Sequence, residues 1–257
     1  MDLKIKNKLF VVTGATSGFG RAIAEVLIQE GAHIIINARG EEKLVAFKND
    51  HPDQIEIVAG DITSDAVISK LIRQVDDRSL SGILINAGGP PASSFVSTEM
   101  DQWDEAYKSV LRWKVKLTKA MLPVLGADHY GRIIYIESAS VKQPIADLVL
   151  SNSLRLAVVG FVKTLSQEVA KDGITLNIIA PGYHDTAAMG RLFTKKSELM
   201  DISIDEAKKA FKDQTQTGTL GRPDDLASIA AWLFSPMSSY ITGQTITIDG
   251  GLVSNTL

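Results

Sequence analysis

The chain has 257 residues, 45% of them hydrophobic and 22% charged, and its 27 basic and 30 acidic side chains leave a net charge of −3. This composition excludes a disordered, collagen-like or coiled-coil chain, and the interspersed charges indicate no nucleic-acid partner. The absence of cysteine and the wide spacing of the four histidines exclude disulfides, thiolate chemistry and a metal site built from these side chains.

The first residues lead into a short apolar run that predicts a strand rather than a signal peptide, and no later run approaches the about 18 residues of a membrane span. We therefore expect a cytoplasmic protein without a membrane partner. Segments rich in Ile, Val and Leu alternate with longer segments of helical period, which is typical of a parallel sheet with helices on both faces. The predicted strands are residues 9–13, 33–38, 54–59, 82–86, 132–137, 175–180 and 245–249, and the predicted helices are residues 21–29, 66–75, about 100–125, about 150–171 and 224–234.

The second of the two long helices carries one continuous apolar face at three- and four-residue steps, made by Leu154, Val158, Phe161, Leu165 and Val169. No repeat or linker divides the chain, so we expect a single domain over residues 1–257. The least regular stretch, residues 183–219, allows two interpretations: a solvated helical insertion or a lid over a substrate pocket.

A glycine-rich turn connects the first predicted strand to the first predicted helix, with the spacing Gly14-x-x-x-Gly18-x-Gly20. Glycines at these places let the backbone turn sharply and approach a pyrophosphate, and the helix N-terminus supplies N–H donors. A glycine turn alone is weak support for a nucleotide site, because such turns also occur in proteins that bind nothing.

Other features gather at the same predicted edge of the sheet. Asn86-Ala87-Gly88-Gly89 ends the fourth strand, Asp61 follows the third, and Pro181-Gly182 ends the sixth. With these motifs the chain resembles the short-chain dehydrogenase/reductase family from Leu9 to Gly251, and is similar to its 3-oxoacyl carrier-protein reductases. The resemblance implies a Rossmann-like, doubly wound parallel sheet in the order 3-2-1-4-5-6-7, a nicotinamide dinucleotide cofactor and a homotetramer or dimer.

The resemblance also implies which residues contact the dinucleotide. The contacts to pyrophosphate and ribose fall on Gly14, Ser17, Gly18, Phe19 and Gly20, those to the adenosine half on Asp61, Ile62, Asn86, Ala87 and Gly88, and those to the nicotinamide on Pro181, Gly182 and Thr186.

The end of the second strand decides between the two nicotinamide cofactors. A carboxylate there would accept from the ribose 2′-hydroxyl of NAD(H), but the chain has Asn37 and Arg39 instead. Because arginine suits a phosphate dianion, NADP(H) is favoured over NAD(H). The alternative is that Arg39 merely begins a surface loop.

The residues that the family uses for proton transfer are replaced. The family's serine after the fifth strand is present as Ser138, but the position of its tyrosine, thirteen residues later, holds Ser151, and that of its lysine holds Arg155. The family's asparagine on the first long helix falls near Val110. A phenol with a reference pKa of about 10 can be tuned toward neutrality, whereas a serine hydroxyl cannot.

We therefore expect Ser138 to anchor the substrate oxygen, Ser151 to act as a weak hydrogen-bond partner, and Arg155 to hold the ribose and a positive charge beneath the nicotinamide. Arginine cannot pass a proton, because a guanidinium does not deprotonate in proteins. The acid that replaces the tyrosine is not identified.

Nearby polar residues have competing interpretations. Glu137 is expected to point to the face opposite Ser138 if the strand continues, and a structural role is favoured over that of a base. Tyr183 and His184 are candidates for the missing proton donor. The cations of the first long helix are expected to be surface or subunit-contact charges: Arg112, Lys114 and Lys116.

Three functions follow from these expectations. The first is an NADP(H)-dependent oxidoreductase acting on a small carbonyl or secondary alcohol with an atypical proton relay. The second is a catalytically weak or inactive dinucleotide-binding protein, acting as a sensor or partner subunit. The third is non-redox chemistry, such as dehydration or isomerisation, on the same scaffold.

Overall fold

A computed structural model describes residues 2–126 and 129–256, so both ends of the expected domain at residues 1–257 lie outside the described residues. Over this range the chain forms a seven-stranded, all-parallel sheet in the order β3-β2-β1-β4-β5-β6-β7, which confirms the predicted order. The strands are β1 (Leu9–Thr13), β2 (His33–Ala38), β3 (Ile55–Ala59), β4 (Leu80–Ile85), β5 (Gly131–Ile136), β6 (Ile174–Pro181) and β7 (Thr245–Ile248).

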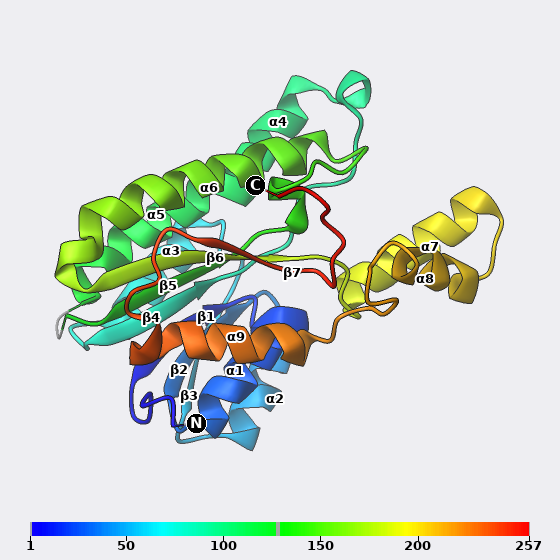
Figure 1. The fold of residues 1–257 in the computed structure, drawn as a ribbon. Helices are drawn as coiled ribbons and strands as arrows, with labels where there is room; N and C mark the ends of the chain where they lie inside the picture. Colours follow the sequence, from blue (N-terminus) through cyan, green and yellow to red (C-terminus); the bar gives the residue numbers. More distant parts are fainter. Residues whose placement is uncertain (1, 127–128, 257) are drawn as a thin grey trace.

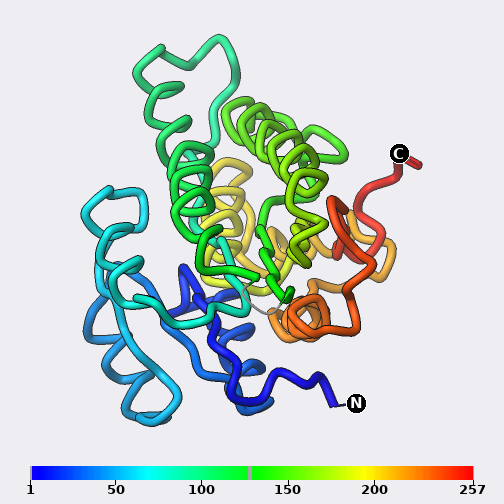
Figure 2. The backbone as a smooth tube through the Cα atoms, turned by 90° about the vertical axis from the view of Figure 1, so that its left-hand side faces the viewer, coloured from blue at the N-terminus to red at the C-terminus, as the bar shows by residue number. Residues whose placement is uncertain are grey.

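Helices cover both faces of the sheet, as Figure 1 shows. One face carries α1 (Gly18–Gln29), α2 (Glu41–Asp50) and α9 (Pro223–Phe234), and the other carries α3 (Asp65–Val75), α5 (Trp113–Met121) and α6 (Val149–Val169). A short helix, α4 (Met100–Ala106), continues into α5 through a π-helical segment at Tyr107–Arg112, and α5 and α6 run side by side (Figures 1 and 2). Among residues 2–126 and 129–256, every helix is too short or too polar to span a bilayer.

Strand β1 pairs with β2 on one side and with β4 on the other, so the strand order reverses between β1 and β4. In doubly wound sheets the carboxyl ends of the strands at this reversal form the ligand-binding edge, because the helices that follow them leave in opposite directions. The sheet order therefore places the glycine turn after β1 beside the residues that follow β4.

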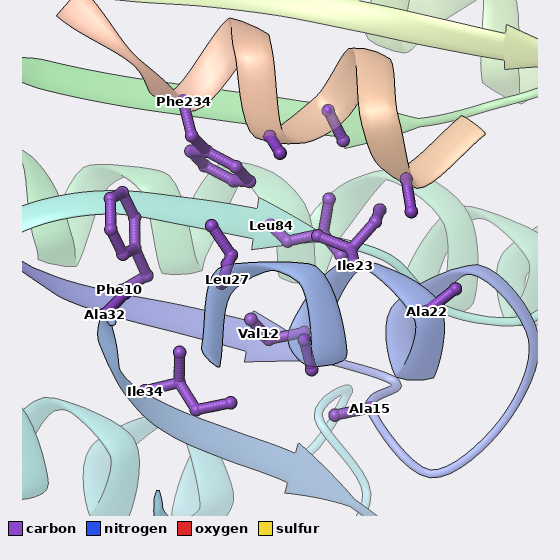
Figure 3. Packing of buried hydrophobic residues seen from close by; sticks show 14 of the residues in the cluster. Phe10, Val12, Ala15, Ala22, Ile23, Leu27, Ala32, Ile34, Leu84 and Phe234 are labelled. Carbon is purple, nitrogen blue, oxygen red and sulfur yellow. The ribbon is translucent and has the colours of Figure 1, made fainter. Parts of the chain in front are cut away.

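The core has one apolar layer on each side of the sheet. On one face of the sheet, Phe10 of β1 meets Phe234 of α9 edge to face, with ring centroids 5.1 Å apart, and Ile23 and Leu27 of α1 pack in the same cluster beside them (Figure 3). On the other face, fully buried Trp113 packs with residues of β4, β5 and α6. Both layers stabilise the strands whose ends carry the site.

Three helices were not predicted as elements. Helix α2 was missed because Leu44 and Phe47 are its only fully buried residues and the others are mostly charged or polar. Helices α7 (Ala187–Met200) and α8 (Ile204–Lys212) lie within the irregular stretch 183–219 and form a pair that projects beyond the carboxyl edge of the sheet (Figure 1).

The buried face of α6 differs from the predicted apolar face. Of the predicted residues only Val158 is fully buried, whereas Phe161, Leu165 and Val169 pack half-buried against the core. The face that points inward is made by Leu150, Ser151, Arg155, Val158, Val162 and Ser166. The helix therefore turns polar side chains toward the sheet near its N-terminus.

Candidate dinucleotide edge and reaction centre

The glycine turn after β1 is packed too closely for side chains. A Cβ on Gly20 would lie 2.2 Å from the Gly14 carbonyl oxygen, and a Cβ on Gly14, whose φ is +65°, would lie 2.8 Å from Asn86 Nδ2. Two of the three motif glycines are thus required by contacts between β1, α1 and the end of β4. Glycine at these positions leaves the backbone accessible to a ligand.

Helix α1 begins at Gly18 directly after this turn. Ser17 precedes it, is exposed and makes no capping hydrogen bond within the described residues, and the first turn carries no acidic residue. Its first N–H groups and its dipole therefore favour an anion. Thr186, at the start of α7, lies 3.6 Å from a Cβ built on Gly18, so the segment after β6 reaches the turn.

Hydrogen bonds fasten the end of β4 to the end of β1. The Thr13 hydroxyl donates to the Asn86 carbonyl at 2.9 Å and accepts from the Asn86 N–H at 2.8 Å. Gly88, two residues further on, has open space where a Cβ would be, and Ala87 is half-buried. The structure thus brings the predicted Gly14, Gly20 and Asn86 into one cluster.

The ends of β2 and β3 lie next to each other. Arg39 is exposed immediately after β2, while Asn37 is buried and donates its amide hydrogens to the carbonyls of Val58 in β3 and of Gly60 just after it. Asp61 accepts from the Thr63 N–H and hydroxyl, which shapes the loop after β3. Ile62 is buried in the core.

The reaction end lies between β5 and α6. Ser138 follows β5, and its Oγ accepts from the Ser140 N–H at 3.1 Å, which leaves the hydroxyl hydrogen free to donate. It leads into a 3₁₀ turn against which α6 packs. Ser151 and Arg155 lie one helical turn apart on α6, and Arg155 Nε donates to Ser151 Oγ at 3.1 Å. The structure therefore joins these two predicted residues directly.

A buried ion cluster forms here that the sequence did not predict. Glu137 is fully buried and accepts from Lys114 Nζ on Oε1 and from Arg155 Nη1 on Oε2, the latter at 2.9 Å. The Lys114 and Arg155 side chains are only 3% and 10% exposed. Burial lowers the pKa of Lys114, and the negative charge of Glu137 opposes part of this shift.

One prediction is corrected by this cluster. The prediction that Lys114 is a surface or subunit-contact charge is wrong, because it lies on the same buried face as Val110, Leu117 and Met121. The spacing of this lysine on an apolar helical stripe was the signal that could have revealed the error. The condition under which Glu137 was expected to point to the opposite face, a continuing strand, is not met, because β5 ends at Ile136.

Arg112 and Lys116 behave as predicted for surface cations. Both side chains are exposed and both pair with Asp65 on α3, at 3.4 Å and 2.7 Å.

Gly89, at the end of the motif after β4, borders the free side of the guanidinium. A Cβ on this residue would lie 2.8 Å from Arg155 Nη2. Glycine is thus the residue that lets the arginine reach the edge of the sheet.

Tyr183 and His184, the candidate proton donors, point elsewhere. The Tyr183 hydroxyl donates to Gln214 Oε1 at 3.3 Å, and its ring packs on Phe211 of α8. His184 is buried, with Nδ1 3.2 Å from the Gly182 carbonyl and its ring edge-on to Phe19 at 5.0 Å. Burial lowers the pKa of His184, which keeps its imidazole neutral at neutral pH. Both residues therefore belong to the segment beside the glycine turn.

A doubly wound parallel sheet with a glycine turn at the point of strand reversal defines an α/β protein of the Rossmann type. A family profile described as enoyl-(acyl carrier protein) reductase matches residues 14–253. The chain belongs to this family, the short-chain dehydrogenases/reductases, whose members are oxidoreductases.

Individual relatives extend over almost the whole chain. The 3-oxoacyl-(acyl-carrier-protein) reductase FabG of Rickettsia bellii is 32% identical over 98% of this chain and 99% of its own. Dehydrogenase/reductase SDR family member 4 of Caenorhabditis elegans is 32% identical over 97% and 96%. Among solved structures, L-sorbose reductase of Gluconobacter frateurii, complexed with NADPH and L-sorbose, is 26% identical, with a TM-score of 0.93 over 99% and 100% of the two chains.

Proposed function

We propose that the protein is an NADP(H)-dependent oxidoreductase that interconverts a small carbonyl compound and its secondary alcohol through an atypical proton relay. The observation that carries this proposal is the intact dinucleotide edge, where Gly14, Gly20 and Asn86 are packed with no room for further side chains. Family membership and the reductases among its relatives support the same reaction class.

The residues of this edge fit a dinucleotide. The uncapped N-terminus of α1 and the glycine backbone around Gly18 supply N–H donors for a pyrophosphate. Asp61, Ile62 and the segment from Asn86 to Gly88 would hold the adenosine half. Pro181, Gly182 and Thr186 would hold the nicotinamide and its carboxamide.

Arg39 supports NADP(H) over NAD(H). Its side chain is exposed at the end of β2, where a 2′-phosphate would lie, and the neighbouring Asn37 amide is occupied by β3 carbonyls. A guanidinium can form two parallel hydrogen bonds to a phosphate.

Ser138 and Ser151 supply the hydrogen bonds at the reacting oxygen. When bound, a reduced nicotinamide supplies a hydride to the carbonyl carbon, and the oxygen then takes a proton to give the alcohol. Ser138 donates its free hydroxyl hydrogen to that oxygen. Ser151 donates likewise, because its own oxygen already accepts from the Arg155 guanidinium, which polarises the hydroxyl.

The proton itself comes from water or from a group on the substrate. Neither serine has the pKa of a general acid, and the guanidinium does not deprotonate. Loss of a positioned acid costs about 10²- to 10⁴-fold in rate, so we expect slow turnover rather than none. Arg155 retains the positive charge of the family's lysine and its hydrogen bonds to the nicotinamide ribose.

We also propose that α7 and α8 form the lid over the substrate. They are held together by their own small apolar cluster of Met189, Phe193 and Ala207, and they leave Leu199 and Met200 exposed. A pair of helices packed mainly on itself can move as a unit.

The test is a paired fluorescence titration with NADPH and NADH, followed by a panel of ketones monitored by the absorbance of the reduced nicotinamide. We expect tighter binding of NADPH and slow, saturable oxidation. Tight binding without turnover on any ketone would support the inactive binding protein instead. Failure to bind either dinucleotide would refute both functions.

A further inference from the structure

We propose that Lys114, Glu137 and Gly89 are positioning residues that hold the Arg155 guanidinium in the orientation in which it contacts the nicotinamide ribose. This inference rests on the proposed function, since it concerns the anchor of that cofactor. It assigns a role to three residues that lie on α5, just after β5 and in the segment after β4.

The carboxylate of Glu137 fixes one edge of the guanidinium. It lies 18 residues before Arg155 in the chain, and its Oε2 accepts from Arg155 Nη1 at 2.9 Å with the carboxylate fully buried. A buried, hydrogen-bonded pair of this kind has little freedom, because separating its charges in a low dielectric is costly.

Ser151 holds the guanidinium at a second nitrogen. Arg155 Nε donates to Ser151 Oγ at 3.1 Å across one turn of α6. A planar guanidinium held at both Nε and Nη1 can neither rotate about its long axis nor tilt. Its remaining nitrogen, Nη2, then faces Gly89 at the carboxyl edge of β4.

Gly89 leaves room for Nη2 beside the segment after β4. The missing Cβ would lie 2.8 Å from Nη2, which is closer than a carbon and a nitrogen can approach without displacement. Any larger residue would push the guanidinium away from the edge on which the dinucleotide lies.

Lys114 sets the charge of the cluster. Glu137 paired with Arg155 alone would be neutral, but Lys114 occupies the other carboxylate oxygen and restores one net positive charge. A buried positive charge at this place stabilises an anionic cofactor and an oxygen that gains negative charge. The cluster thereby supplies the charge that the family obtains from one lysine, using two cations and one anion.

The experiment compares two ligands that differ at the anchored group. NADPH contains the nicotinamide ribose, and adenosine 2′,5′-bisphosphate lacks it. Gly89→Ala, Glu137→Gln and Lys114→Met are each expected to weaken NADPH binding about 10- to 150-fold, the range of one charge-assisted hydrogen bond, and to leave the affinity for the bisphosphate within about twofold. Gly160→Ala on α6 and Lys116→Met on α5 are the matched controls, because Gly160 has open space around it and Lys116 is exposed.

Arg155→Ala separates this inference from the proposed function. If Arg155→Ala itself leaves NADPH affinity unchanged, the anchor role in the proposed function fails. If Arg155→Ala weakens NADPH binding but Gly89→Ala and Glu137→Gln do not, the positioning role is refuted while the anchor role of Arg155 stands. Equal weakening of both ligands would likewise overturn it, since that is the result of a purely structural defect.

A double variant tests whether Gly89 acts through Arg155. Gly89→Ala keeps every charge, so it carries the test even where Glu137→Gln does not fold. In the Arg155→Ala background, Gly89→Ala is expected to weaken NADPH binding by less than about a further twofold, because a residue that acts through Arg155 has nothing left to position. A full additional loss would contradict the proposal.

Discussion

The two ends of the site lie on one edge of the same sheet but use different kinds of atoms. The dinucleotide end is built from backbone: Gly14, Gly20 and the N-terminus of α1 present N–H groups, and their packing excludes side chains. The proposed reaction end is built from side chains, among them the hydrogen-bonded Ser151 and Arg155, which we expect at the positions of the family's tyrosine and lysine.

This difference would account for a preserved dinucleotide end and an altered reaction end. The backbone at Gly14 and Gly20 tolerates no side chain, since a Cβ at either position would collide with the chain. Side-chain groups can be replaced, but in a buried site only together, because each charge needs a partner. Arg155 is accompanied by Glu137, and Glu137 is accompanied by Lys114.

The largest effect is expected from rebuilding the family's relay. Ser151→Tyr with Arg155→Lys supplies the phenol and the amine, but Glu137 would still pair with the new amine and hold it in the ion cluster. Adding Glu137→Gln and Lys114→Met removes that pairing, and we expect the fourfold variant to reduce ketones about 10²- to 10⁴-fold faster than the wild type. Values of kcat/KM for the double and fourfold variants decide the point. Equal rates in the two would show that the ion cluster does not constrain the reaction end.

Breaking the ion cluster is expected to have the next largest effect. Glu137→Ala leaves two buried cations without a counter-ion and should lower the free energy of unfolding by about 3–5 kcal/mol. Glu56→Ala, which removes an exposed partner of Arg78, should cost only about 0–1 kcal/mol. Urea unfolding measures both. Similar losses in the two variants would mean that the cluster is effectively solvated.

An intermediate effect is expected at the dinucleotide end. Gly20→Ala forces the turn apart and should lower the free energy of unfolding by about 1–3 kcal/mol. It should also weaken NADPH binding. Gly160→Ala, in open space on α6, should stabilise the protein by up to about 1 kcal/mol. Thermal unfolding and fluorescence titration provide the two measurements. Retained NADPH affinity in Gly20→Ala would show that the close packing of the turn is not required.

The smallest effect is a dependence of stability on pH at the dinucleotide end. Burial lowers the pKa of His184 below its ordinary value of 6.5, so below pH 6.5 the unfolded chain binds a proton that the folded chain does not. Stability therefore falls as the pH drops below 6.5. His184→Gln should flatten this slope between pH 7.5 and 5, because glutamine does not titrate in this range. Urea unfolding at several pH values tests this, and parallel curves for the two proteins would contradict it.

The strands were predictable from the chain alone, because buried parallel strands have continuous runs of Ile, Val and Leu. Their order was predicted from the resemblance to the short-chain dehydrogenases/reductases and is confirmed by the sheet. The glycine turn between a strand and a helix is also a local signal, so the dinucleotide edge could be proposed without knowledge of the tertiary structure. The proposed replacements at residues 151 and 155 rest on their spacing from Ser138, which lies within one strand–helix unit.

Only the tertiary structure shows the ion cluster around Arg155. Lys114 and Glu137 are 23 residues apart, and a lysine among other helical cations resembles a solvated face until α5, β5 and α6 are packed together. The lengths of α2, α7 and α8 were likewise hidden, since few of their residues are buried. Local patterns report local conformation, whereas the pairing of buried charges depends on which elements meet in space and on the low dielectric between them.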